Sequence, residues 1–378
     1  MKRKYAAVVI ILIFIQASGM PIMAQVMKVP HSSSRGTWLY VGGGGPGNYT
    51  KIQDALDNAS DGDTVFVYDE LSPYVEYLTI RHSITFLGES RDTTIINGIV
   101  GWRSMLRIIA EHVIVQGFSF VQHGADGVFI QSDNVTITGN LIAHIGWDAI
   151  DVEDATRINI SDNIISDAEF GVFFYNSAYS YEDNIIAHNI IRNMSENGIY
   201  LSGDSNTIHG NDIAQIGKVG VLLHEVSFTN ISSNTISSCT DGIQLMNSYQ
   251  NTLYRNNLTA NRRFGLLVID SSSDTVFENN FMNNTQNARI IFDLIGELIV
   301  HRVLGYPLLP IPTQWARNFW DAPRLLPYPI PTHLMFGLWI AGWLELFFEI
   351  VFQKTYVRDF INFVRLDRNP AQESYDIS

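Results

Sequence analysis

The strongest constraint on the fold is a pair of residue columns that recur seven times between Asp126 and Phe281. The asparagine column has steps of 22 to 26 residues and consists of Asn140, Asn163, Asn189, Asn211, Asn234, Asn256 and Asn279. The second column has steps of 22 to 27 residues and consists of Gly127, Ala149, Gly171, Gly198, Gly220, Gly242 and Gly265. A unit this short cannot bury its apolar face alone, so the copies must stack on one another as a solenoid.

Within each unit, apolar residues alternate with a period of two, which is typical of β-strands. The inward-facing pairs of the first strand are Val128 and Ile130, Val172 and Phe174, Ile199 and Leu201, Val221 and Leu223, and Ile243 and Leu245. A helical array would show a 3.6-residue period instead. We therefore predict an all-β solenoid, a parallel β-helix with one coil per repeat and neighbouring strands about 4.8 Å apart.

Both columns have a structural explanation. An asparagine at one corner of every coil can stack its side-chain amide on the copy in the next coil, and it tolerates the left-handed backbone conformation. Glycine at the other corner supplies either a positive φ angle or close contact between coils. We therefore expect these residues to hold the coils together rather than to take part in chemistry.

The N-terminus is typical of an export signal, because three basic residues at positions 2–4 precede an apolar run at positions 6–15. We predict that residues 1–24 are a signal peptide, with an uncleaved anchor as the alternative. The formal net charge of -14 disfavours nucleic acid as a partner. Cys239 is the only cysteine, so the chain has no internal disulfide framework.

A glycine-rich stretch precedes the repeats. Gly42, Gly44 and Gly47 spell the dinucleotide-binding fingerprint, but Pro46 removes a backbone amide where that motif would bind pyrophosphate. Coils, rather than further βα units, follow the motif. We therefore predict that residues 25–63 are a cap whose helix, residues 49–59, covers the open end of the solenoid, and that the β-helix occupies residues 64–287.

Several of these segments resemble a known group of proteins. The glycine-rich stretch, the segment Asp61-Gly62-Asp63 and the asparagine-glycine coils look like the right-handed parallel β-helix proteins of the NosD-like group, and Pro370-Ala371 with its flanks resembles the tail of archaeal surface members. The resemblance implies a right-handed, exported solenoid related to carbohydrate-binding and sugar-hydrolase repeats. One branch of the group serves copper-site maturation of nitrous oxide reductase, and no motif in this chain carries that role over.

Acidic and aromatic residues meet on the outer face of the first strand of each coil. The outward column consists of Phe129, Asp151, Phe173, Tyr200, Leu222, Gln244 and Leu267. Asp126 and Asp148 should stack on adjacent coils near Asp151, so we predict these three aspartates as a candidate catalytic site. In such a site one carboxyl group donates a proton while another accepts one or attacks.

Phe129, Phe173 and Tyr200 are the predicted glycan-binding residues, since aromatic side chains can stack on sugar rings. Glu153 and Asp154 lie close enough in sequence to join them. With these two acids the site could bind calcium instead. In the alternative interpretation, all the acids are turn residues of an acidic protein, where a charge at a coil corner is simply solvated.

Catalytic β-helix families provide a further comparison. A polygalacturonase-like enzyme would show a paired Asp-Asp, a Gly-His-Gly and an Arg-x-Lys on successive coils. Here Asp148 stands alone between Trp147 and Ala149, His209 lacks a preceding glycine, and no Arg-x-Lys occurs. Hydrolysis of that kind is therefore disfavoured, and Arg157 is the one nearby candidate for the base of a lyase.

The residues after the repeats follow another pattern. Ala288 to Leu309 have helical spacing, and we predict a C-terminal cap over residues 288–378. Residues 334–352 are nearly all apolar or aromatic, but Glu345 and Glu349 would each cost about 2.5 kcal/mol or more near the centre of a bilayer. A membrane span is therefore disfavoured but stays an alternative, and we expect this helical segment either to pack over the outward column of the solenoid or to lie at a membrane surface.

Together these features predict an exported protein located outside the cell, at the cell surface or in the periplasm. The leading interpretation is recognition of a polysaccharide or envelope glycan, or a structural role in the envelope. The first alternative is a lyase, hydrolase or epimerase that acts on uronic-acid-type glycans, and the second is a factor for copper-site maturation. One solenoid can host all of these functions, so the fold does not decide between them.

Overall fold

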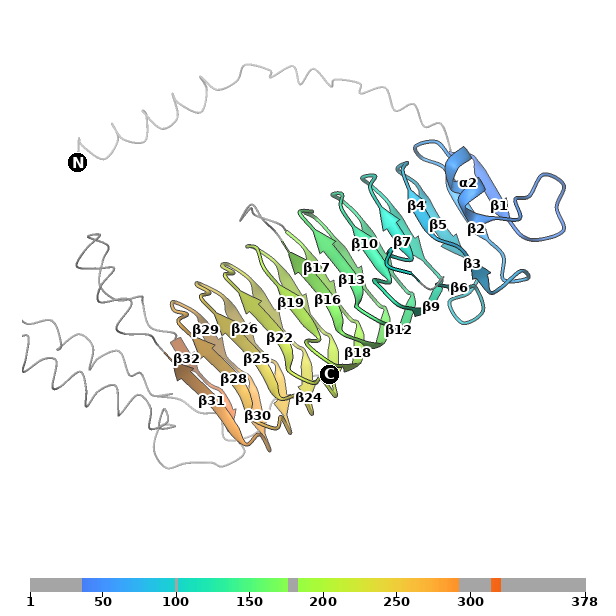
Figure 1. Cartoon of the computed structure of the whole chain (residues 1–378). Helices are drawn as coiled ribbons and strands as arrows, with labels where there is room; N and C mark the ends of the chain where they lie inside the picture. The colour runs from blue at the N-terminus through green and yellow to red at the C-terminus, as the bar shows by residue number, and fades with distance from the viewer. Residues whose placement is uncertain (1–35, 99–100, 176–182, 292–313, 321–378) are drawn as a thin grey trace, which may run out of the picture. The chain divides into compact units, whose positions relative to one another are not determined.

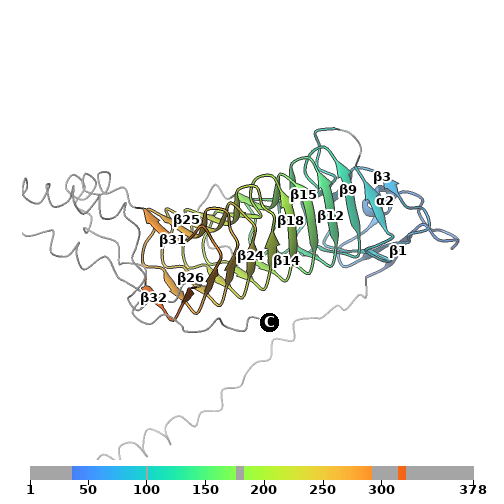
Figure 2. The same cartoon turned by 90° about the horizontal axis from the view of Figure 1, so that it is seen from below.

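The computed structural model describes residues 36–98, 101–175, 183–291 and 314–320. In this part of the chain the strands form three sheets of twelve, eleven and ten strands, and neighbouring strands of each sheet come from successive coils. Strands of successive coils lie side by side along the solenoid (Figure 1; Figure 2). The parallel β-helix predicted from the repeat is therefore confirmed.

Each complete coil contributes one strand to each sheet, while the first described coil gives only β1 and the last only β32 and β33. Sheet A consists of β1 (Trp38–Val41), β2 (Thr64–Val67), β5 (Thr85–Gly88), β8 (Ile114–Gln116), β11 (Thr136–Thr138), β14 (Asn159–Ser161), β17 (Ile185–Ala187), β20 (Thr207–His209), β23 (Asn230–Ser232), β26 (Thr252–Tyr254), β29 (Thr275–Phe277) and β32 (Gln314–Ala316). Sheet B consists of β3 (Tyr74–Val75), β6 (Ile95–Asn97), β9 (Ser119–His123), β12 (Leu141–Ile145), β15 (Ile164–Ala168), β18 (Ile190–Met194), β21 (Asp212–Ala214), β24 (Thr235–Ser237), β27 (Asn257–Thr259), β30 (Asn280–Met282) and β33 (Phe319–Trp320). Sheet C consists of β4 (Leu78–Ile80), β7 (Leu106–Ile108), β10 (Val128–Ile130), β13 (Asp148–Glu153), β16 (Phe170–Tyr175), β19 (Ile199–Leu201), β22 (Val219–His224), β25 (Asp241–Met246), β28 (Phe264–Ile269) and β31 (Gln286–Ile291).

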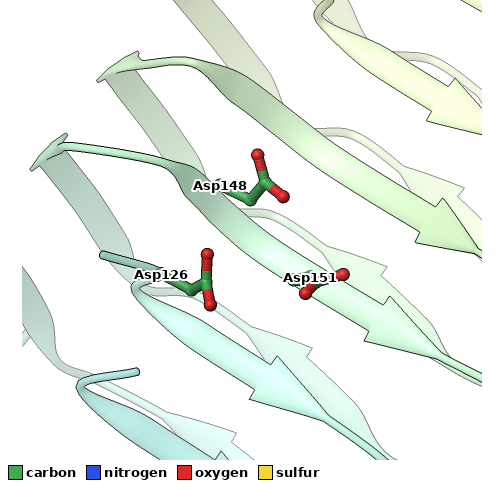
Figure 3. A group of neighbouring side chains, drawn as sticks. All are labelled: Asp126, Asp148 and Asp151. Carbon is green, nitrogen blue, oxygen red and sulfur yellow. The ribbon is translucent and has the colours of Figure 1, made fainter. Parts of the chain in front are cut away.

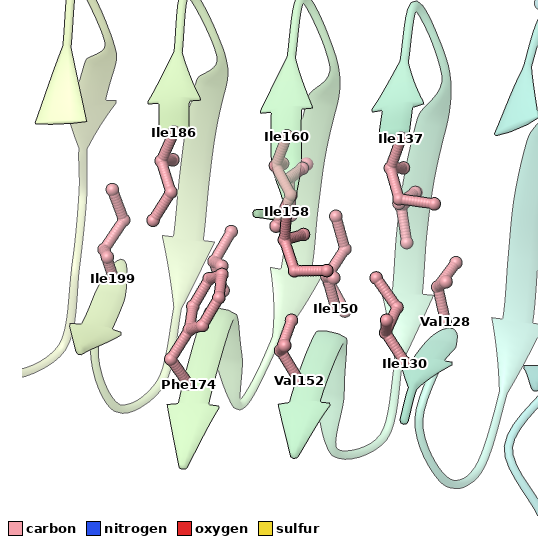
Figure 4. Close-up of a cluster of buried hydrophobic side chains, with 14 of the residues drawn as sticks. Val128, Ile130, Ile137, Ile150, Val152, Ile158, Ile160, Phe174, Ile186 and Ile199 are labelled. Atoms are coloured by element: carbon pink, nitrogen blue, oxygen red, sulfur yellow. The ribbon is translucent and has the colours of Figure 1, made fainter. Parts of the chain in front are cut away.

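The core lies between the three sheets and is built from the alternating apolar residues. Ile137, Ile160 and Ile186 occupy one register position of sheet A in successive coils and are almost fully buried. They point toward Val128 and Ile150 of sheet C (Figure 4). Because burying one such side chain contributes about 1.5–3 kcal/mol, stacking supplies the stability that no single coil can reach.

The coil corners repeat an unusual backbone conformation. At the corner from sheet B to sheet C, the same position has a φ angle between 52° and 60° in Gln122, His144, Asp167, Asn193, Gln215, Ser238, Ala260 and Asn283. At this corner, one left-handed residue in each coil turns the chain sharply without a glycine. The corner therefore tolerates several residue types, which keeps it free of a strict sequence signature.

The asparagine column forms a hydrogen-bonded ladder, as predicted. The side-chain amide of Asn211 donates to the carbonyl oxygen of Ile186 at 2.8 Å, and Oδ1 of Asn234 accepts from the backbone N and from Nδ2 of Asn211 at 2.9 and 3.0 Å. The same pattern continues to Asn318, whose Oδ1 accepts from the backbone of Asn279 at 3.0 Å. Residues 314–320 are thus one further coil.

The glycine column serves close contact between coils and not positive φ. A Cβ atom on Gly198 would lie 2.6 Å from the carbonyl oxygen of Gly220 and 2.9 Å from Cγ2 of Ile213. Other members of the column, such as Gly171, meet the next coil in the same way. Of the two roles that the sequence left open, the structure supports close packing.

One short helix, α2 (Ile52–Asn58), packs against β1, β2 and β4 and buries Ile52, Ala55 and Leu56. It falls within the range predicted for the capping helix. β1, which was expected in the cap, is the first strand of sheet A. This N-terminal end of the solenoid therefore carries a helix over its core.

A helix was predicted to begin at Ala288, but residues 288–291 belong to a strand. Gln286–Ile291 form β31, which pairs in parallel with β28, and Ala288 is buried beside Leu266. A short apolar run fits either period, and here an exposed strand edge was present to pair with it. Residues 1–24, 292–309 and 334–352 lie outside the described residues, so the predicted signal peptide and C-terminal helices stay predictions. Within the described ranges, no helix has the length and apolar character to cross a membrane.

Candidate functional site

The outward column predicted from the sequence is present on sheet C. Phe129 pairs with Asp151, Asp151 with Phe173, and Phe173 with Tyr200 on adjacent strands. Arg107 precedes Phe129 in the same column. Because side chains of a strand alternate between its two faces, a column of outward residues forms on the solvent side.

The three predicted aspartates form one cluster, which we call the aspartate cluster. Asp126 lies just before β10, while Asp148 and Asp151 both belong to β13. A carboxylate oxygen of each lies within 4.8 Å of one from each of the others, and all three residues are half-buried. Figure 3 shows their carboxyl groups gathered over two neighbouring strands. Ser104 Oγ donates a hydrogen bond to Oδ2 of Asp126 at 3.1 Å.

Burial dominates the electrostatics of this cluster. It raises the pKa of Asp148 to about 8, with the charges of Asp151 and Asp126 as further causes. Burial also raises the pKa of Asp151 to about 7, helped by the charges of Asp126 and Glu153. The pKa of Asp126 is raised by burial as well, against the opposing hydrogen bond from Ser104. At neutral pH the cluster therefore holds at least one proton.

No ion pair joins these aspartates to a basic side chain in the described part of the chain. Two arginines of this region are engaged elsewhere. Arg107 donates to Oε1 of Gln131 at 2.6 Å, and Arg157, the predicted candidate base, pairs with Asp133 at 2.8 Å. The cluster is thus free to share protons with a ligand.

Aromatic rings adjoin the aspartate cluster on its C-terminal side. Phe173 stacks on Tyr200 with ring centroids 4.8 Å apart, and Phe170 meets Phe173 edge-on at 5.1 Å. The hydroxyl group of Tyr200 is 3.0 Å from Nδ1 of His224. Since Tyr200 covers one ring face of Phe173, these rings form an apolar floor next to Asp151.

Two tryptophans that the sequence did not single out as binding residues lie at the other border. Trp102 and Trp147 have ring centroids 5.7 Å apart, and they are 84% and 40% exposed. Trp147 directly precedes Asp148, and Trp102 is two residues before Ser104. This adjacency to the acids was the signal available in the sequence.

Two predicted binding residues do not join the aspartate cluster. Glu153 lies further along β13, where its Oε2 accepts from Nε2 of Gln131 at 2.7 Å. Asp154 is exposed in the following turn, with a φ angle of 49°. The group of carboxylates that could hold an ion is accordingly limited to the three aspartates among the described residues.

Comparison with known proteins assigns this solenoid to a family. Residues 56–291 match the family described as periplasmic copper-binding protein (NosD). The chain belongs to the NosD family. The resemblance seen in the sequence is confirmed, and the matched range contains the whole aspartate cluster.

A relative of this NosD family member is a cell surface glycoprotein of Methanothermus fervidus, 26% identical over 298 residues. The match covers 67% of this chain and 47% of the relative, so the chain spans about half of the relative's length. Among solved structures, the A-module of a mannuronan C-5 epimerase of Azotobacter vinelandii is 13% identical, with a TM-score of 0.52 over 74% of this chain and 93% of that chain. The Dettilon tailspike protein is 14% identical, with a TM-score of 0.53 over 75% and 60%. At such identities the structural similarity shows the fold alone.

The name of the NosD family implies copper, which can be tested against the ligands present. Copper in proteins prefers imidazole nitrogen and the sulfur of cysteine or methionine, whereas carboxylate oxygens suit calcium, magnesium or manganese. In the described ranges, the one group of three close ligands is the aspartate cluster. Its all-carboxylate donor set does not fit copper.

Proposed function

We propose that this NosD family member is an exported envelope protein that binds a polysaccharide across the N-terminal half of the outer face of sheet C. The observation that carries this proposal is the continuity of exposed tryptophans, clustered carboxyl groups and an apolar floor on that face. The surface glycoprotein relative and the family's periplasmic description support the location outside the cytoplasm. A structural role in the envelope is compatible with it.

Each part of this surface has a role in holding a sugar chain. The open ring faces of Trp102 and Trp147 stack on pyranose rings, and Phe173 with Tyr200 supports the adjacent residue of the polymer. Carboxyl groups of Asp148 and Asp151 with pKa values of about 8 and 7 can donate as well as accept hydrogen bonds to hydroxyl groups near neutral pH. The site therefore needs no basic side chain to bind a neutral glycan.

The charge of the ligand decides how binding depends on pH. Above about pH 8 the cluster is largely ionised, so a uronate polymer is repelled unless a divalent cation such as calcium lies between the carboxylates. A neutral polysaccharide does not meet this repulsion. Calcium should consequently increase the binding affinity only for acidic glycans.

The test is affinity electrophoresis with neutral and uronate polysaccharides at pH 6 and pH 9, with and without calcium. Trp147→Ala and Phe173→Ala should weaken retention by about tenfold, as expected for the loss of one stacking contact of 1–1.5 kcal/mol. Tyr254→Ala is the matched control, because Tyr254 stacks on Phe277 on the outer face of sheet A. Equal retention of all variants would contradict the proposed surface.

A second candidate is catalysis by the same cluster. It is favoured by one specific observation, that burial and mutual repulsion raise the carboxyl pKa values so that a protonated acid stands beside other carboxyl groups near pH 7. A lyase, hydrolase or epimerase uses such a pair. The structural similarity to a mannuronan C-5 epimerase supports testing uronate polymers first.

Catalysis is measured as new reducing ends, unsaturated-uronate absorbance and a change in uronate stereochemistry. An enzyme would lose activity by 100-fold or more in Asp151→Asn, as expected for removal of an acid or base. Retention of glycans without any product in the wild type would leave binding as the function. Product formation unchanged by the substitution would place the chemistry elsewhere.

A further inference from the structure

The outer face of sheet C changes along the solenoid. Phe173, Tyr200 and Leu222 are half-buried, as expected for outward residues on a solvent side. Further along the same column, Gln244 is 7% exposed and Leu267 only 3%. The described helix α2 packs at the other end, on β1, β2 and β4, and no described strand lies over β25 and β28.

We propose that residues 334–352 dock as a helix on the outer face of β25 and β28. This inference is independent of glycan binding. The segment is apolar enough to cover Leu267 and Leu222, and its acids provide a polar edge. Docking accounts for the low exposure of Leu267 and Gln244 and also covers the half-buried Leu222 beside them.

The position of the chain end agrees with this occupant. The last described strand is β33, which pairs with β30. The described chain therefore ends at the C-terminal end of the solenoid, where the buried outward residues Gln244 and Leu267 also lie. Residues 321–333 separate β33 from the segment. An extended chain of that length reaches about 40 Å, which is enough to return to sheet C.

Charge complementarity points to the same surface. Arg289 follows Leu267 in the column, its Nε atom is buried without a hydrogen-bond partner, and its guanidinium lies 5.5 Å from the centre of the Phe264 ring. Glu345 and Glu349 are one helical turn apart in the segment. Either carboxylate can pair with Arg289 once the segment is docked.

Helix length limits how far the segment can reach. Residues 334–352 span about 28 Å as a helix, which equals roughly six spacings between neighbouring strands of about 4.8 Å each. Even when aligned with the solenoid axis and starting at β31, the helix would end between β16 and β13, short of β10. Phe129 on β10 therefore stays accessible in every orientation, and Asp151 on β13 stays open when the helix crosses β25 and β28 obliquely.

The test is the rate of maleimide labelling at introduced cysteines in the full chain. Leu267→Cys and Gln244→Cys probe the covered half, and Phe129→Cys on β10 is the matched control in the same column. Cys239 does not compete, because it is fully buried and burial raises its pKa to about 12. Circular dichroism and thermal melting confirm that each variant folds.

We expect Leu267→Cys and Gln244→Cys to label at least tenfold more slowly than Phe129→Cys, at any protein concentration. Adding Glu345→Lys and Glu349→Lys should restore fast labelling. Equal rates at the three positions would overturn the proposal. Slow labelling that disappears on dilution would assign the face to a second copy of the chain. Protection that requires vesicles of phosphatidylcholine and phosphatidylglycerol would assign it to a membrane surface. Both results contradict docking of residues 334–352.

Discussion

Asp148 and Asp151 belong to the same strand, β13, and their carboxylate oxygens lie within 4.8 Å of each other and of Asp126. Asp148 also has the largest raised pKa of the three, about 8. Three acids at this distance cannot all ionise without a cost in stability. The fold therefore maintains a cluster that would be unfavourable if it served packing alone.

This cluster makes stability depend on pH. In the unfolded chain an aspartate ionises near pH 4, whereas Asp148 keeps its proton to about pH 8 in the folded chain. Between these values the native state binds more protons than the unfolded state, so the free energy of unfolding falls as pH rises. The contribution is fully present below about pH 4 and lost as pH rises through 7 to 8.

Asp148→Asn should remove most of this slope. We expect the free energy of unfolding to rise by about 2 kcal/mol at pH 9, after allowance for solvent access, and to change little at pH 4. Urea unfolding followed by circular dichroism at both pH values measures it. Asp162→Asn, at an exposed corner, is the control. A variant that is less stable than the wild type at pH 9 would contradict the assigned electrostatics.

The asparagine ladder should be costly to interrupt. Asn211 is 1% exposed, and Asn211→Ala removes the acceptor of the backbone N–H of Asn189, one acceptor of its Nδ2 and the side-chain donor to the carbonyl oxygen of Ile186. We expect a loss of about 3 kcal/mol in urea unfolding. Asn193→Ala is the control, since it is exposed and its corner position already accepts an alanine at Ala260. A loss of the same size at both sites would mean that the ladder has no special role.

The glycine column should reject even one methyl group. Gly198→Ala places a Cβ atom 2.6 Å from the oxygen of Gly220, and we expect a loss of about 2 kcal/mol, because two backbones must separate. Gly44→Ala meets no atom within 4 Å and should change stability by less than about 1 kcal/mol. Thermal melting of the two variants measures the difference. Equal melting temperatures would show that the coils adjust freely.

The helix α2 is capped by a residue that is distant in sequence. The carboxylate of Glu76 accepts from the backbone N–H groups of Ile52 and Gln53 at 2.9 and 3.0 Å. Glu76→Ala should reduce the stability of this end by about 1 kcal/mol and speed hydrogen exchange in residues 52–58. Glu70→Ala, at an exposed position, should leave that exchange unchanged. Unaltered exchange in the Glu76 variant would show that α2 is held by packing alone.

Residues whose position follows from the repeat could be placed from the sequence, because the repeat sets the register between coils. Asn211 and Gly198 recur with their coils, so their neighbours above and below follow from the period. The column Phe129, Asp151 and Phe173 followed in the same way, because alternation decides which residues face outward.

Residues that come from corners or insertions were not predictable in this way. Trp102 lies in a turn before the regular array, and its contact with Trp147 depends on the path of that turn. Asn318 completes the ladder 39 residues after Asn279, so the period gives no sign of it. Ala288 has apolar neighbours that suit either a helix or a strand, and the free edge of β28 decided between them.

The most direct test of the account is a hydrogen-exchange footprint of the full chain with and without a polysaccharide that it retains. We expect slower exchange in β10, β13 and β16 and in the turn that carries Trp102, with β25, β28 and sheet A unchanged. Slower exchange confined to sheet A, or none on sheet C at saturating glycan, would contradict the claim that the aspartate cluster and its aromatic borders form the binding surface.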